Sequence, residues 1–123
     1  MLTEIKSWEK DVIESPIPVI VDVSSEWCMP CKAMIPVLED LATEYEGKIK
    51  FLGMDVEKHR DIVTSLDIKA VPTILFIYGQ KEFNLVATVE KLVGARSKIE
   101  IKTKIEEILG EHRDIKTDSS DRS

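Results

Sequence analysis

The chain contains two cysteines, Cys28 and Cys31, which lie three positions apart in the stretch EWCMPCK. Such a pair can form a structural disulfide, supply half of a metal site, or act as a reversible redox couple. The structural disulfide is disfavoured, because a bridge that closes so short a loop removes little entropy from the unfolded chain. A zinc site needs four ligands, and the isolated His59 and His112 are interpreted as solvated side chains. A redox couple, an inert buried pair and half of a zinc site remain open on these residues alone.

The composition limits the class of protein. With 123 residues, 43% of them hydrophobic and 33% charged, the chain is typical of one globular domain. A formal net charge of -6 argues against a nucleic-acid partner. No apolar run approaches the roughly 20 residues that span a membrane, and the N-terminal stretch lacks the pattern of a signal peptide. We therefore expect a cytoplasmic protein with no membrane partner, and in that compartment lasting structural disulfides are rare.

The elements beside the cysteines suggest how the pair is positioned. The β-branched run Val19–Val23 is typical of a strand buried on both faces, with Asp22 as its one polar residue. From Cys28 to about Tyr45 the apolar spacing becomes helical. A helix N-terminus favours a thiolate, because its free N–H groups and its dipole stabilise negative charge. Cys28, exposed at the helix start, is predicted to be the nucleophile, and the more buried Cys31 the resolving thiol.

The remaining patterns predict the order β-α-β-α-β-α-β-β-α, a mixed central β-sheet with helices on both faces. A strand is expected over 49–56, a helix over 59–66, and an antiparallel pair from Pro72 with its turn at GQKEF, residues 79–83. Ser97 and Glu100 predict a capping box for the last helix, and Gly110 its end. We expect one domain, residues 1–110, followed by a polar, disordered tail, residues 111–123.

Several motifs in this order are similar to those of the thioredoxin family. They are VDVSSEWCMPCK with its Trp-Cys-x-Pro-Cys-Lys core, Pro36 five residues after Cys31, VPT before a strand, and VGARSK before the last helix. The resemblance covers residues 1–110 and implies an α/β thioredoxin fold. It also implies a thiol–disulfide oxidoreductase that reduces protein disulfides through a reversible Cys28–Cys31 disulfide, in cell redox homeostasis. Such a protein is a monomer without a cofactor, and a thioredoxin reductase or an equivalent donor supplies its electrons.

The same resemblance implies roles for further residues. Asp22 corresponds to the family's buried aspartate, a proton relay for Cys31. Pro72 corresponds to a cis-proline facing the disulfide, and Val71 to the backbone that pairs with a bound substrate strand. The substrate-binding surface implied in this way comprises Trp27, Met29, Pro30, Val71, Pro72, Gly94 and Ala95.

Some residues depart from the family pattern. Gly53 stands where a lysine usually pairs with the buried aspartate, so we expect burial to raise the pKa of Asp22 without a cation to oppose it. Met29 replaces a common glycine between the cysteines. Ser24 and Ser25 make the floor of the site more polar.

These departures leave two alternatives open. Met29, together with a segment between Thr73 and Gly94 that is longer than in the family pattern, fits a dedicated redox partner, an oxidant or an isomerase with a shifted potential. The longer segment is expected to project as a ledge for a specific partner. A protein-interaction module that uses the apolar rim of Trp27, Val71 and Ala95 without the cysteines is the other alternative.

Overall fold

The computed structural model describes residues 2–80 and 87–121. Its elements follow the predicted order and are β1 (Thr3–Glu4), η1 (Glu9–Ile13), β2 (Val19–Ser24), α1 (Met29–Glu44), β3 (Lys50–Asp55), α2 (Arg60–Ser65), β4 (Thr73–Tyr78), β5 (Thr88–Val93) and α3 (Lys98–Asp121). Within the described part of the chain, no helix is long and apolar enough to cross a membrane.

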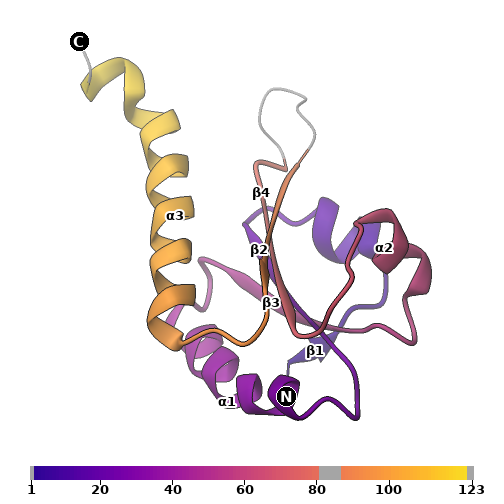
Figure 1. Cartoon of the computed structure of the whole chain (residues 1–123). Helices are drawn as coiled ribbons and strands as arrows, with labels where there is room; N and C mark the ends of the chain where they lie inside the picture. The colour runs from indigo at the N-terminus through magenta and orange to yellow at the C-terminus, as the bar shows by residue number, and fades with distance from the viewer. Residues whose placement is uncertain (1, 81–86, 122–123) are drawn as a thin grey trace.

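One five-stranded sheet organises the fold, with the strand order β1-β3-β2-β4-β5. Strand β3 runs parallel to both β1 and β2, whereas β4 is antiparallel to β2 and to β5. Helices α1 and α3 lie on one side of this sheet, and η1 and α2 lie on the other (Figure 1). The mixed α/β architecture implied by the resemblance is therefore confirmed.

Strand β2 lies at the centre of the sheet because its side chains are apolar on both faces. Val19, Val21 and Val23 pack with residues such as Leu52 and Leu75 in a buried cluster on the η1 and α2 side. Full burial of a side chain of this size stabilises the fold by roughly 1.5–3 kcal/mol. The carboxyl end of this rigid strand, where Asp22 lies, is therefore a well-supported base for the loop that carries the cysteines.

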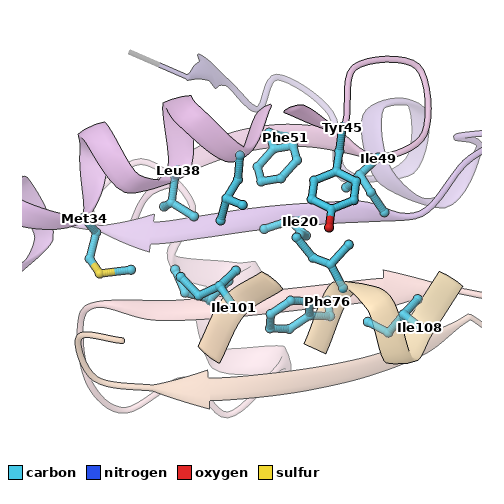
Figure 2. Close-up of a cluster of buried hydrophobic side chains, with 12 residues drawn as sticks. Ile20, Met34, Leu38, Tyr45, Ile49, Phe51, Phe76, Ile101 and Ile108 are labelled. Atoms are coloured by element: carbon cyan, nitrogen blue, oxygen red, sulfur yellow. The ribbon is translucent and has the colours of Figure 1, made fainter. Parts of the chain in front are cut away.

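The opposite face of the sheet carries a second buried cluster, beneath α1 and α3. Figure 2 shows side chains from these two helices meeting those of Ile20, Phe51 and Phe76 on three neighbouring strands. On α3 the contacts come from Ile101, Ile105 and Ile108, all almost fully buried. The helix that begins at the cysteines is thus packed against the sheet along its length.

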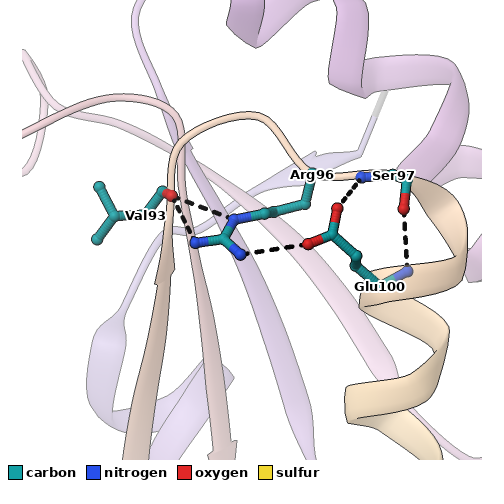
Figure 3. Close-up of polar contacts among 4 residues, drawn as sticks. All are labelled: Val93, Arg96, Ser97 and Glu100. Atoms are coloured by element: carbon teal, nitrogen blue, oxygen red, sulfur yellow. Dashed lines mark hydrogen bonds and ion pairs between the residues drawn. The ribbon is translucent and has the colours of Figure 1, made fainter.

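Helix α3 begins with the predicted capping box. The Ser97 hydroxyl oxygen accepts the Glu100 N–H at 3.1 Å, and a Glu100 carboxylate oxygen accepts the Ser97 N–H at 3.1 Å (Figure 3). The predicted end at Gly110 is wrong, because α3 continues to Asp121. Gly110 does not take the positive φ of a helix-ending glycine, and the residues after it include no proline that would stop the helix.

The end of α1 agrees with the predicted end near Tyr45. Helix α1 ends at Glu44 with Tyr45 as its C-cap, and Gly47 lies in the following turn with a φ of 84°. The expected turn at residues 79–83 and the projecting ledge fall largely on residues 81–86, outside the described residues.

Candidate active site

The two cysteines form a disulfide at the start of α1. Cys28 is the N-cap residue, with an extended backbone at φ −97° and ψ 109°. The Cys31 N–H, one of the free donors of the first turn, donates to Cys28 Sγ at 3.2 Å. Pro30 lies at the first turn, where its missing N–H removes no helical hydrogen bond. The helix start therefore places a hydrogen-bond donor and the positive end of the helix dipole at the sulfur of Cys28.

Cys31 is more buried than Cys28, as predicted, but the prediction that Cys28 is exposed is wrong. Cys28 is 8% exposed and Cys31 is 2% exposed. In this oxidised state Cys28 Sγ is turned toward Cys31 and accepts its N–H, so the sulfur presents little surface. The flanking side chains are the exposed ones, with Trp27 at 73% and Met29 at 71%. An apolar rim thus surrounds a recessed disulfide.

The cis-proline implied by the resemblance is present. The Val71–Pro72 peptide bond is cis, Val71 is half-buried and Pro72 is buried. The Pro72 carbonyl accepts the Gly94 N–H at 2.8 Å. This hydrogen bond ties the loop before β4 to the loop after β5, so Val71, Pro72, Gly94 and the exposed Ala95 belong to neighbouring loops.

Arg96 holds the second of these loops and was missed in the sequence interpretation. Its Nε and Nη2 donate to the Val93 carbonyl at 3.2 and 3.0 Å, and Nη1 lies 3.3 Å from a Glu100 carboxylate oxygen (Figure 3). The arginine therefore bridges the end of β5 and the first turn of α3 across the Gly94 bend. Its place between Gly94 and the N-cap Ser97 was the available signal in the sequence.

Asp22 lies in β2 and is 6% exposed. Among the described residues, its Oδ1 has no hydrogen-bond partner. Burial, and secondarily the negative charge of Glu4, raise the pKa of Asp22 from 3.8 to about 6. The expected direction of the shift is therefore confirmed, and the contribution of Glu4 is new.

Gly53 lies directly beside Asp22 in the register of β2 and β3, so position 53 provides no cation there. The carboxylate of Glu4, on β1, instead accepts the Asp55 N–H at 3.0 Å. It also lies 3.2 Å from His59 Nε2, and the His59 side chain is only 16% exposed. The interpretation of His59 as a solvated side chain is thus wrong, because the spacing of residues along the chain does not reveal a contact between β1 and the loop before α2.

The floor of the site is polar, as Ser24 and Ser25 suggested. Ser25 is 5% exposed, and its Oγ has no hydrogen-bond partner in the described residues. Its carbonyl accepts the Cys28 N–H at 3.4 Å. Over residues 2–80 and 87–121, no group of three or more His, Cys, Asp or Glu side chains is arranged to hold a metal ion.

Comparison with known proteins agrees with this geometry. The family model described as Thioredoxin matches residues 1–107. The thioredoxin of Pseudomonas aeruginosa is 36% identical over 95 residues, which cover 77% of this chain and 82% of the relative. The thioredoxin of Buchnera aphidicola subsp. Schizaphis graminum is 36% identical over 102 residues, 83% of this chain and 89% of the relative.

A chloroplast protein is also among the relatives. The M-type thioredoxin of Spinacia oleracea is 38% identical over 86 residues, which cover 69% of this chain but 48% of the relative, so the matched region spans about half of that protein. The family match, the bacterial relatives and the cysteine pair at the start of α1 lead to one conclusion. The chain belongs to the thioredoxin family and is a thiol–disulfide oxidoreductase.

Proposed function

We propose that Cys28 and Cys31 reduce the disulfides of protein substrates by successive thiol–disulfide exchange. The hydrogen bond from the Cys31 N–H to Cys28 Sγ at the start of α1 carries this proposal. In the reduced protein the same donor and the helix dipole stabilise a Cys28 thiolate, the form that attacks a disulfide.

In the first step, Cys28 Sγ bonds to one substrate sulfur and the substrate disulfide breaks. The second substrate sulfur leaves as a thiolate and takes up a proton. In the second step, the Cys31 thiol gives its proton to Asp22, Cys31 Sγ bonds to Cys28 Sγ, and the mixed disulfide breaks. The first substrate sulfur leaves as a thiolate with the electron pair of the broken S–S bond. Over the two steps, the substrate disulfide is thus reduced by two electrons. The protein is left with the Cys28–Cys31 disulfide found in the structure.

Asp22 is suited to accept this proton for two reasons. It is buried on β2 with an unpartnered carboxylate oxygen. Its pKa, raised to about 6, keeps it ionised at neutral pH while making it a stronger base than an ordinary aspartate. Asp22 therefore serves as the general base for Cys31.

Substrates dock on the apolar rim around the disulfide. Trp27 and Met29 contribute large exposed side chains, and Val71, Pro72, Gly94 and Ala95 provide the two loops tied by the Pro72–Gly94 hydrogen bond. Pro30 completes the rim from the first turn of α1. The exposed Val93, which the sequence interpretation did not include, lies beside Gly94 at the end of β5 and extends this surface.

The oxidised protein must be reduced again by an external dithiol donor. A thioredoxin reductase or an equivalent enzyme fills this place in the cycle, and the protein acts as a monomer in the cytoplasm through its domain of residues 1–110. Support for the compartment comes from the chemistry, because a reductant of this type works where thiols are kept reduced.

Trapping tests the order of attack. In Cys31→Ser, the mixed disulfide with a model substrate such as insulin should accumulate through Cys28, because no thiol resolves it. Cys28→Ser is the matched control and should trap little. Mass spectrometry of the alkylated protein measures both yields. Equal trapping by the two variants would contradict the assignment of Cys28 as the nucleophile.

The reduction potential tests the direction of electron flow. Equilibration in graded thiol–disulfide buffers measures it, and for this two-electron couple 30 mV corresponds to about 1.4 kcal/mol. A potential below that of the cytosolic glutathione pool is expected for a general reductant. A value at or above it would overturn the reductant role in favour of oxidation or isomerisation, with Met29 the first residue to exchange.

A further inference from the structure

Three residues form a row across the sheet beneath α1. Asp22 on β2 is paired with Gly53 on β3, and Gly53 is paired with Glu4 on β1. Side chains in register on neighbouring strands point to the same face of the sheet. The carboxylates of Asp22 and Glu4 therefore share one face, with a residue that lacks a side chain between them.

The missing side chain at position 53 matters for this pair. A Cβ atom there would lie 3.8 Å from Glu4 Oε1 and 3.9 Å from the Cβ of Leu2. A longer side chain would come between the two carboxylates. Because position 53 is glycine, no side chain of this row lies between the charge of Glu4 and the carboxyl group of Asp22.

The carboxylate of Glu4 is held in place by a backbone N–H group and by an imidazole. One carboxylate oxygen, Oε2, accepts the Asp55 N–H at 3.0 Å and lies 3.2 Å from His59 Nε2. The Glu4 side chain is 41% exposed and that of His59 is 16% exposed. The imidazole is the basic partner of this carboxylate, so a positive charge on it would partly offset the charge that Glu4 presents to Asp22.

Among the described residues, Glu4 is the charged group that contributes to the raised pKa of Asp22. On β4 its partner in register is the apolar Ile74. Helix α1 contributes Cys31, the proposed reaction partner of Asp22, which carries no charge in the disulfide. Asp55 extends from the same strand as Gly53, and its carboxylate oxygen Oδ1 accepts the Glu57 N–H at 2.8 Å.

We propose that Glu4 and His59 are a positioning pair that controls the ionisation of Asp22 and thereby the rate at which Cys31 resolves the mixed disulfide. With His59 neutral, Glu4 acts in full and Asp22 holds its proton more strongly. With His59 protonated, the charge of Glu4 is partly offset and Asp22 ionises more readily. This inference rests on the proposed role of Asp22 as the base for Cys31.

The test follows the ionisation of Asp22 directly, by carbon-13 NMR of its carboxyl group in the oxidised protein as the pH is varied. Glu4→Gln removes the charge and keeps the shape, so the Asp22 midpoint should move to lower pH. His59→Gln removes the side chain that can carry the offsetting positive charge, so the Asp22 midpoint should move to higher pH. In the Glu4→Gln background, His59→Gln should have a smaller effect, because its influence passes mainly through Glu4.

Glu57→Gln is the matched control. It also neutralises a carboxylate that has a basic side-chain partner, since Glu57 lies 2.9 Å from Arg60 on the surface. The Asp22 midpoint should not move in this variant. An unchanged midpoint in Glu4→Gln, or a shift as large in Glu57→Gln, would overturn the proposal.

A second measurement separates this inference from the proposed function. Single-turnover resolution of a preformed mixed disulfide should show a pH profile that moves in the same direction as the Asp22 midpoint in each variant. A midpoint that moves while the rate profile stays in place supports the control of Asp22 by Glu4 and overturns the base role of Asp22.

Discussion

At the scale of single residues, the charge of Asp22 links the chemistry of the site to the stability of the fold. A buried carboxylate without a cationic partner is unfavourable when ionised, which is why burial raises the pKa of Asp22 to about 6. The folded protein therefore binds this proton more strongly than the unfolded chain does. Stability falls as the pH rises from about 4 to about 6, and the loss is complete above that range.

Asp22→Asn should remove this loss. The difference between 3.8 and about 6 corresponds to roughly 3 kcal/mol, so the oxidised variant should gain up to that amount at pH 8 and much less at pH 4. Urea unfolding at both pH values measures the gain. Asp40→Asn, the same change on the exposed side of α1, should show no such pH-dependent gain. An equal effect of Asp22→Asn at both pH values would contradict the raised pKa.

The backbone conformation of Gly94 affects both the stability of the fold and the loops beside the disulfide. Its φ is 91°, a conformation that favours glycine, although a Cβ there would meet no atom within 4 Å. Gly94→Ala should destabilise the protein by about 1–2 kcal/mol through backbone strain alone. Because the strain falls on the loop bonded to Pro72, the variant should also form mixed disulfides more slowly.

Gly110→Ala is the control for this change. Gly110 has open space around it and a helical place in α3 without a positive φ, so alanine there should stabilise the helix by up to about 1 kcal/mol. Denaturant unfolding and trapping rates measure both variants. A Gly94→Ala variant that changes neither the stability nor the trapping rate would show that the bend does not need glycine.

At the scale of elements, the start of α3 couples helix capping to the rim of the site. Ser97 and Glu100 satisfy each other's N–H groups, and Arg96 joins the same carboxylate to the Val93 carbonyl. The Ser97 N–H, followed by Arg96, lowers the pKa of Glu100. The contribution of Glu100 is thus present at neutral pH and is lost as the pH falls through its lowered pKa.

Ser97→Ala should therefore destabilise the protein by about 1 kcal/mol. Thermal or urea unfolding at pH 7 measures the loss. Thr103→Ala is the control, because Thr103 is an exposed residue of the same helix and alanine is a better helix former. A loss in Thr103→Ala as large as that in Ser97→Ala would attribute the effect to the helix surface instead of the cap.

At the scale of the whole molecule, the apolar contacts of α3 that the structure describes lie before Gly110. Ile101, Ile105 and Ile108 lie in the cluster under α1 and α3, and Figure 1 shows the later turns of α3 extending past the sheet. Residues 1–110 are therefore proposed to form the complete folding unit.

A chain that ends at Gly110 should have a free energy of unfolding within about 1 kcal/mol of that of the full chain. It should also reduce insulin at the same rate. A chain that ends at Glu107 is the matched control. It also loses Ile108, which is 3% exposed, and Leu109, which packs against the same cluster, and should be less stable by about 2–4 kcal/mol. Equal stability of the two truncated chains, or a large loss in the longer one, would overturn the domain boundary.

The sequence by itself determined the local parts of this protein. Hydrophobic periodicity identified the strands and helices, Ser97 and Glu100 identified the cap of α3, and the place of Cys28 after a buried strand identified the helix start that activates it. These features depend on residues that are close along the chain. The raised pKa of Asp22 was also predictable, because a lone carboxylate in an apolar strand is buried whatever surrounds it.

Only the tertiary structure decided which distant side chains meet at the site. The row of Asp22, Gly53 and Glu4 depends on the register of three strands, and the contact of Glu4 with His59 depends on the path of the loop before α2. The recessed position of Cys28 is likewise a product of packing. Strand register and loop path arise from the summed contacts of the whole core, and no short stretch of sequence contains that sum.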